Sequence, residues 1–150
     1  MNFMWVDIDH NLNIDGTLLK ETIEEYKAKA VVVVHYFGSA SNIEPLIKIC
    51  RSLNVKIVED CAHSFGATLY DNHSGLFGNA GVYSFYATKA IPAGEGGVIV
   101  TNDQELGSMI TSFSIYDRFE QKLEIGNNIR ISEVQALLTY SIVKEFQLII

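Results

Sequence analysis

The hydrophobic and polar positions along the chain switch repeatedly between strand and helix patterns. Short apolar runs rich in β-branched residues predict strands, and apolar residues spaced three and four apart predict amphipathic helices. The predicted strands lie at residues 3–8, 31–37, 55–60, 82–87 and 97–101. The predicted helices lie at residues 16–30, 45–53, 104–113 and 133–146. Strands alternating with helices across short loops predict an α/β domain with a mostly parallel sheet and flanking helices.

Two apolar stretches carry more specific expectations. The segment VVVVHYF at 31–37 is apolar almost without a break, which is typical of a central parallel strand covered on both faces. The segment FMWVDI at 3–8 begins as a strand already under way, and the chain ends at KEFQLII within an apolar pattern. We therefore expect the chain to be a piece of a longer fold, truncated at both ends.

Residues that cap helices stand at the expected helix starts. Asp15 precedes the first helix, and Asn102 or Asp103 precedes the third. Two S-x-x-E/Q capping boxes precede the other helices, namely Ser41 with Glu44 and Ser132 with Gln135. The inward stripes expected from the spacing are Leu19, Ile23 and Tyr26 in the first helix, and Val134, Leu138, Ile142 and Phe146 in the last.

Composition limits the function classes. The 150 residues are 48% hydrophobic, enough for one domain with a real core, and the net charge is -7. Such an acidic chain is a poor candidate for binding nucleic acid or an anionic membrane surface. The longest apolar run is too short to span a bilayer, and the N-terminus has no basic signal-peptide region. Cys50 and Cys61 form no CxxC pair, so we expect reduced thiols in a cytoplasmic protein.

Three segments with reactive or ligand-binding residues follow predicted strands. They are EDCAH at 59–63, TK at 88–89 and GEGG at 94–97. Because ligands bind beyond the carboxyl ends of parallel strands, these segments predict one shared site. The glycines match neither phosphate-binding pattern, GxGxxG nor GxxxxGK[ST], and are interpreted as tight-turn residues.

Lys89 and Asp60 each have a functional and a structural interpretation. Lys89 has small, apolar neighbours, and a lysine withdrawn from water becomes a nucleophile toward carbonyls. Otherwise it is an ordinary solvated lysine. Asp60 ends an apolar strand, and a protonated pyridine nitrogen, as in pyridoxal phosphate, would supply the cation that a buried carboxylate needs. Otherwise it caps a helix or joins an internal salt bridge.

The histidines give no metal signature. His63 could be a ligand, a base or a flat surface for stacking, but HExxH is absent. The other three show no metal-ligand spacing, so we expect no metal site; they are His10, His35 and His73. Cys61 and His63 would share one face of an extended chain, which leaves a thiol nucleophile as a minor alternative.

Several motifs in order resemble one known family. They are VHYFG at 34–38, EDCAHSFGA at 59–67, GLFGNAGVYSFYATK at 75–89, GEGG at 94–97 and GNNIRISEVQA at 126–136. This order resembles the DegT/DnrJ/EryC1/StrS family of pyridoxal-phosphate-dependent sugar aminotransferases. The resemblance covers nearly all of the chain. It implies the aspartate-aminotransferase-like fold, fold type I, with residues 1–150 as a partial cofactor-binding large domain.

The resemblance implies a role for each matched residue. Asp60 would pair with the pyridine nitrogen of the cofactor, and His63, where the family often has Gln or His, would stack on its ring. Ser84 would bind the cofactor phosphate. Lys89 would form the Schiff base with the cofactor and then move protons. Asn128 would reach the phosphate of a partner subunit's cofactor, which implies a homodimer; Glu59 is left as structural.

The resemblance also implies a reaction. Related sugar dehydratases carry His in place of the lysine, so Lys89 favours transfer of an amino group, commonly from glutamate, to a nucleotide-linked keto sugar. Such products enter polysaccharide, lipopolysaccharide or amino-sugar biosynthesis. The family's N-terminal phosphate-binding loop and small C-terminal domain have no counterpart here. The alternative is therefore a remnant or binding module of the same fold without catalysis.

Overall fold

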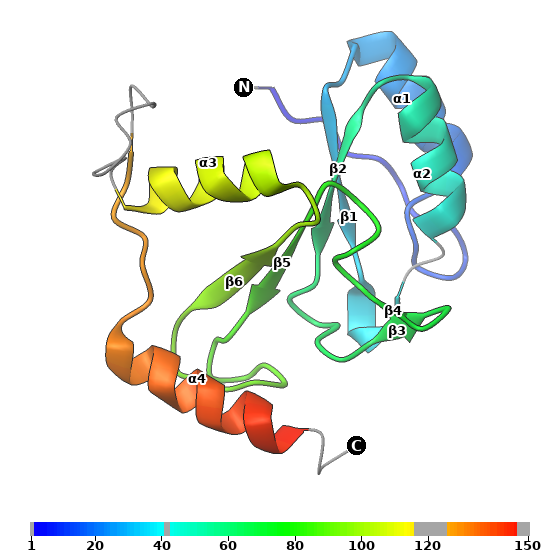
Figure 1. Ribbon diagram of the computed structural model, residues 1–150. Helices are drawn as coiled ribbons and strands as arrows, with labels where there is room; N and C mark the ends of the chain where they lie inside the picture. Colours follow the sequence, from blue (N-terminus) through cyan, green and yellow to red (C-terminus); the bar gives the residue numbers. More distant parts are fainter. Residues whose placement is uncertain (1, 41–42, 116–125, 147–150) are drawn as a thin grey trace.

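The computed structural model describes residues 2–40, 43–115 and 126–146. Helices and strands alternate up to residue 60, as the sequence predicts, whereas residues 61–100 contain strands and turns without a helix (Figure 1). The helices are α1 (Gly16–Tyr26), η1 (Tyr36–Gly38, a 3-10 turn), α2 (Ile43–Ser52), α3 (Gln104–Ser114) and α4 (Glu133–Phe146). The strands are β1 (Ala30–Val34), β2 (Lys56–Asp60), β3 (Thr68–Leu69), β4 (Asn72–His73), β5 (Ala80–Ser84) and β6 (Gly97–Val100).

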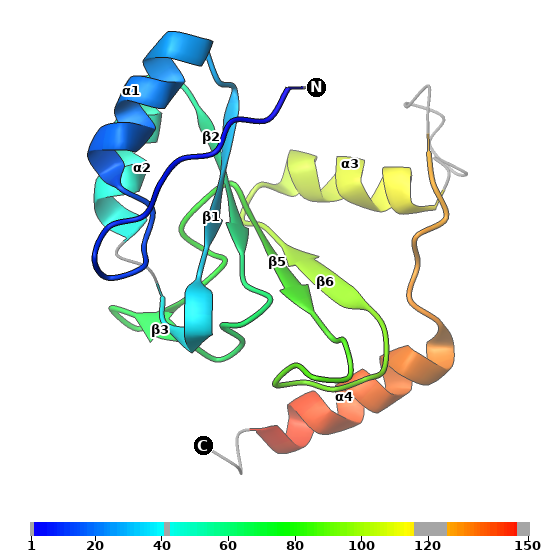
Figure 2. The same ribbon diagram turned by 180° about the vertical axis from the view of Figure 1, so that it is seen from behind.

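The main sheet has the strand order β1-β2-β5-β6. The first three strands are parallel, and β6 runs antiparallel to β5. A short antiparallel hairpin, β3-β4, lies in the connection between β2 and β5, where the sequence predicted neither a strand nor a helix. Both views show α1 and α2 side by side along the same side of β1 and β2 (Figures 1 and 2). The expected mostly parallel α/β sheet is confirmed.

Two apolar clusters hold these elements together. The larger one fills the space between α1, α2 and the adjoining face of β1 and β2, and its buried members are Leu19, Ile23, Val31, Val33, Ile43, Leu46, Cys50, Val55 and Ile57. The smaller one lies after β5, where Ile142 and Phe146 of α4 pack against Phe85, Ile91 and Ala93. The last helix is thereby attached to the end of the sheet that carries the predicted site.

Two expectations about strands are wrong. Residues 3–7 form no strand, and Ile8 makes only an isolated bridge to Ile14. Strand β1 is an edge strand of the described sheet rather than a central one, and Val32 and Val34 are exposed on one face. A β-branched run favours extended backbone whether or not both faces are covered, so the run alone does not fix the strand's place in the sheet.

The helix caps agree better with the sequence than the helix stripes do. The side chains of Asp15 and Asp103 accept hydrogen bonds from the first turns of α1 and α3. Ser132 Oγ accepts the Gln135 N–H at 3.3 Å, which confirms that capping box. Ser41 of the other capping box lies outside the described residues. The expected stripes are too wide, because three of their members are largely exposed: Tyr26, Val134 and Leu138.

None of the helices in the described segments is long and apolar enough to cross a bilayer. The two cysteines, Cys50 and Cys61, are both buried and unpaired, in agreement with the expected free thiols.

Candidate active site at the carboxyl ends of the strands

The two carboxylates that end β2 project from opposite faces of the sheet, because side chains alternate along a strand. Glu59 is in register with Val33, on the face covered by α1 and α2. Asp60 is in register with Val82 on the other face. Ser84, two residues after Val82, therefore shares a face with Asp60. Glu59 thus points toward the side of the sheet that α1 and α2 cover, and Asp60 points toward the other side.

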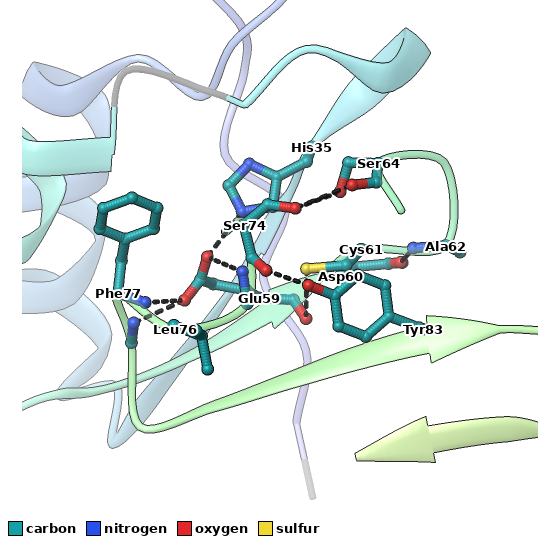
Figure 3. Close-up of polar contacts among 12 residues, drawn as sticks. His35, Glu59, Asp60, Cys61, Ala62, Ser64, Ser74, Leu76, Phe77 and Tyr83 are labelled. Atoms are coloured by element: carbon teal, nitrogen blue, oxygen red, sulfur yellow. Dashed lines mark hydrogen bonds and ion pairs between the residues drawn. The ribbon is translucent and has the colours of Figure 1, made fainter. Parts of the chain in front are cut away.

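Glu59 lies in a fully enclosed polar cluster and has an exposed fraction of 0%. Its Oε2 pairs with His35 Nε2 at 2.8 Å and accepts the Gly75 N–H at 2.7 Å. Its Oε1 accepts the N–H groups of Phe77 and Gly78 at 2.8 and 2.6 Å. Figure 3 shows the carboxylate between His35 and the loop that leads into β5. Glu59 is therefore structural, as expected, and joins β1, β2 and this loop.

The charges in this cluster support each other. Burial by itself would lower the pKa of His35, but hydrogen bonding and charge interactions with Cys61 and Glu59 raise that pKa from 6.5 to about 9. Burial would raise the pKa of Glu59, but its hydrogen bonds from His35, Gly78 and Gly75 hold it below the usual value. The pair is consequently an imidazolium and a carboxylate at neutral pH.

Three groups that could ligate a metal come together here, although their spacing along the chain gave no such signal. One ligand atom each from His35, Glu59 and Cys61 lies within 4.8 Å of the others, and all three side chains are buried. Each oxygen of Glu59 already accepts two donors, one set including the imidazolium. The Glu59 carboxylate is thus satisfied by protein donors, and its arrangement is explained without a metal ion.

The His35–Glu59 pair predicts a pH dependence of stability. His35 is protonated in both the folded and the unfolded chain below pH 6.5, so its stabilisation is complete there. Between pH 6.5 and about 9 only the folded chain keeps the proton, and the free energy of unfolding should fall by on the order of 3 kcal/mol. Glu59 contributes above its unfolded pKa and loses its contribution as the pH falls through its lowered folded pKa.

Urea unfolding between pH 6 and 10 measures this effect. The variant His35→Gln is the control, since glutamine is polar but does not titrate. Its free energy of unfolding should be lower than that of the unsubstituted chain at pH 6.5. Between pH 6.5 and 9 that free energy should fall much less in the variant than in the unsubstituted chain. If the free energy of unfolding fell equally steeply with pH in both proteins, the result would contradict a charged His35 in the folded chain.

The loop beneath Glu59 packs closely on β5. A Cβ at Gly81 would lie 2.3 Å from the Gly75 Cα, so these two glycines permit backbone contact that no other residue would. The Tyr83 hydroxyl donates to the Ser74 carbonyl, and Ser74 Oγ donates to the Ser64 carbonyl at 2.9 Å. These contacts fix the segment between β2 and β5, and with it the positions of the residues at both strand ends.

Asp60 and Ser84 lie on the face of the sheet opposite to Glu59. Asp60 is half-buried, and its Oδ1 accepts the Ala62 N–H at 3.0 Å. Ser84 is also half-buried, and its Oγ accepts the Tyr86 N–H at 3.3 Å. In the described part of the chain no ion pair reaches Asp60, so the internal salt bridge considered for it is not found there. The buried carboxylate with an internal cation is Glu59.

Lys89 and His63 line one pocket of about 380 Å³. Its other lining residues are Phe37, Ala62, Thr88 and Ala90. Lys89 is half-buried, and its backbone N–H donates to the Tyr86 carbonyl at 2.9 Å in the turn after β5. His63 is exposed and stacks on Tyr36, with ring centroids 5.8 Å apart.

Another hollow, beside α2, is lined by Arg51, Asn54 and Lys56 among others and contains none of the predicted site residues.

The structure separates the remaining candidates. Cys61 is buried beside His35 and Glu59, whereas His63 is exposed, so the proposed Cys61–His63 thiol pair does not share a face. Asn128 bridges to Ile115 after α3 and accepts the Arg130 Nε–H at 3.0 Å. It does not line the Lys89 pocket.

Sequence reasoning missed two features of the site. The pairing of His35 with Glu59 was foreseeable only from the ends of two neighbouring parallel strands, because Glu59 lies near the end of β2 and His35 directly follows β1. Tyr36 and Phe37 were noted only as part of a motif, yet Phe37 lines the pocket of Lys89. The strand predicted over residues 31–37 included both of them, whereas β1 ends at Val34 and both lie in the turn η1.

The sequence matches the DegT/DnrJ/EryC1/StrS aminotransferase family over residues 2–150. A curated relative from Helicobacter pylori, UDP-4-amino-4,6-dideoxy-N-acetyl-beta-L-altrosamine transaminase, is 34% identical over 148 residues and is matched by 95% of this chain. The solved structure of Helicobacter pylori PseC, an aminotransferase involved in the biosynthesis of pseudoaminic acid, superposes on 97% of the chain with a TM-score of 0.87 and 33% identity. The structure of E. coli GDP-4-keto-6-deoxy-D-mannose-3-dehydratase with bound hydrated PLP superposes on 95%, with a TM-score of 0.81 and 28% identity.

The match covers this chain far more completely than it covers the relatives. The chain spans 39% of the transaminase, 40% of PseC and 42% of the dehydratase. Within that span the fold is that of pyridoxal-phosphate-dependent aminotransferases, as the sequence predicted. The chain belongs to the DegT/DnrJ/EryC1/StrS aminotransferase family.

Proposed function

We propose that the chain carries the cofactor-binding core of a sugar aminotransferase that acts on a nucleotide-linked keto sugar. The observation that supports this most directly is the pocket shared by Lys89 and His63 at the carboxyl ends of β2 and β5. Asp60 and Ser84 end the same two strands and share the open face of the sheet. A primary amine, an imidazole, a carboxylate and a hydroxyl are thereby available around one region.

These groups fit pyridoxal phosphate, on which the family depends. Asp60 would hold a proton on the pyridine nitrogen, and His63 offers an exposed flat ring on which the cofactor ring can stack. The Ser84 hydroxyl would donate to the phosphate. The cofactor supplies an electron sink for carbanion chemistry when bound, and the protein's part is to bind and orient it.

Lys89 has two tasks in this proposal. Lys89 is half-buried and lines the pocket, where its amine can attach to a carbonyl carbon. Once released, the same amine can take a proton from the substrate carbon and return it elsewhere. The amino donor in this proposal is glutamate, and the product is an amino sugar for polysaccharide or lipopolysaccharide biosynthesis.

The wider setting is proposed on the same basis. Residues 1–150 represent part of the cofactor-binding large domain, and the complete enzyme works in the cytoplasm as a homodimer. Asn128 is exposed and outside the pocket, as a residue that serves a partner subunit's cofactor would be. Sedimentation with and without pyridoxal phosphate tests the dimer.

Cofactor capture tests the central proposal. The purified chain is mixed with pyridoxal phosphate, its visible spectrum is recorded, and borohydride is added to make any covalent link to lysine permanent. We expect a yellow complex and a reduced adduct on the peptide that contains Lys89. An adduct spread over surface lysines such as Lys56 would contradict the proposal.

Because the chain spans only about 40% of these relatives, the alternative of a binding module without catalysis is also tested. A binding module of the same fold would hold the cofactor or a full-length partner without any exchange of amino groups. Cofactor capture at Lys89 is compatible with both functions, so an assay of amino-group transfer by the complete protein separates them.

A further inference from the structure

We propose that Phe37, held in place by Tyr36, presents an aromatic wall that receives the hexose ring of the sugar substrate beside Lys89 and so determines specificity. This inference rests on the proposed function and names the part of the substrate that each side of the pocket contacts. Both residues belong to the 3-10 turn η1 that follows β1. We use "aromatic wall" below for these two residues.

The backbone of Phe37 is in an unfavourable conformation. Its φ and ψ are 53° and 29°, in the left-handed region that a bulky residue rarely adopts. The side chain gains little from burial in return, because 76% of it is exposed. Unfavourable backbone at a residue that the core does not need is typical of a functional site.

The aromatic wall is fixed relative to the pocket. The ring of Phe37 meets the ring of Tyr36 edge to face, with centroids 4.4 Å apart, and Tyr36 in turn stacks on His63. A Cβ at Gly38 would lie 3.3 Å from the His63 carbonyl oxygen, so η1 approaches the His63 loop closely. Phe37 itself lines the pocket together with Lys89 and Thr88.

The position of Lys89 selects the hexose as the occupant. Its amine must reach the sugar carbon that gains nitrogen, so the group next to Lys89 is the sugar ring and not the nucleotide. The carbon-bound hydrogens of a pyranose form apolar patches that pack against aromatic faces, and ligand pockets combine such apolar walls with few polar groups. The nucleotide would then extend away from the aromatic wall.

A matched pair of variants separates ligand binding from structure. Tyr70, in the β3-β4 turn, is also aromatic, 68% exposed and left-handed, with φ 50°, but it lies outside the pocket. We expect Phe37→Gly and Tyr70→Gly each to raise the thermal unfolding midpoint, because glycine adopts this backbone without strain. A fall of the midpoint in Phe37→Gly alone would assign Phe37 a structural role and overturn the inference.

Binding is measured by calorimetric titration of the chain, with and without pyridoxal phosphate. The probes are UDP and GDP hexoses and, as controls, UDP and GDP alone. Phe37→Gly should weaken hexose-conjugate binding about tenfold and leave diphosphate binding unchanged, Tyr70→Gly should change neither, and Phe37→Tyr should restore affinity.

The outcomes distinguish this inference from the proposed function. If the chain takes up the cofactor at Lys89 but Phe37→Gly binds hexose conjugates normally, the aromatic wall is refuted and the proposed function stands. If no form of the unsubstituted chain binds hexose conjugates more tightly than the diphosphates, the inference is also overturned. Absence of cofactor capture at Lys89 counts against the proposed function alone.

Discussion

Replacement of Lys89 by alanine is expected to abolish covalent capture of pyridoxal phosphate and any exchange of amino groups. The methyl side chain has no amine to attach to the cofactor, and it cannot carry the proton between substrate and cofactor. Loss of proton transfer alone should lower the rate by about 10²–10⁴-fold. The borohydride-reduced adduct, mapped by mass spectrometry, and the visible absorbance band measure the loss.

Two further variants show whether the amine or only its charge matters. Lys89→Arg keeps a positive charge at the pocket, but a guanidinium stays protonated and does not act as a nucleophile. It should fail like alanine. Lys56→Ala, at the opposite end of β2, should capture the cofactor normally. An adduct of normal yield in Lys89→Arg would contradict the assignment.

The Lys89 variants should also fold normally. Lys89 is only half-buried and makes no ion pair within the described segments. Substitutions of this kind usually change the free energy of unfolding by less than about 0.5 kcal/mol. A large loss of stability in Lys89→Ala would mean that the missing adduct reports unfolding, so urea unfolding accompanies each capture experiment.

The sequence predicts the elements of this fold well because each depends on local pattern. Strand β2 at 56–60 and helix α3 at 104–114 lie within one residue of their predicted bounds. The exposed face of β1 was not predictable, because four consecutive valines read the same in an edge strand as in a central one. What covers a strand depends on contacts far away in the chain.

The candidate site also depends partly on local pattern and partly on distant contacts. Segments at the carboxyl ends of neighbouring strands were expected to meet, and Lys89 and His63 do line one pocket. The partner of Glu59 could not be read from spacing, since His35 lies 24 residues away and becomes a neighbour only through the register of β1 and β2. The left-handed backbone of Phe37 leaves no trace in composition at all.

Glu59 is the residue whose replacement should cost the most stability. In Glu59→Ala the His35 imidazolium and the three N–H groups of Gly75, Phe77 and Gly78 would lose their acceptor inside the protein. Breaking a buried charge pair by removing one partner costs about 3–5 kcal/mol. Domains are stable by only about 5–15 kcal/mol, so we expect the urea midpoint of Glu59→Ala to fall by a large fraction of its original value.

The milder variant Glu59→Gln keeps the measurement possible if alanine unfolds the chain. Glutamine retains one oxygen acceptor but places an NH₂ group against donors, so it should still lose roughly 2–3 kcal/mol. Asp60→Asn is the matched control, since Asp60 is the next residue on β2 and its side chain accepts one N–H, from Ala62. Urea unfolding should show a loss of about 1 kcal/mol or less for the control.

Comparison of these neighbours tests why two adjacent carboxylates are present. Glu59 would hold β1, β2 and the loop before β5 together, and Asp60 would contact the cofactor. Glu59→Gln should then lower the free energy of unfolding, and Asp60→Asn should mainly weaken retention of the cofactor. Equal effects of both substitutions on unfolding would remove this division. The opposite orientation of the two side chains, buried toward His35 and open toward Ser84, would then have no energetic counterpart.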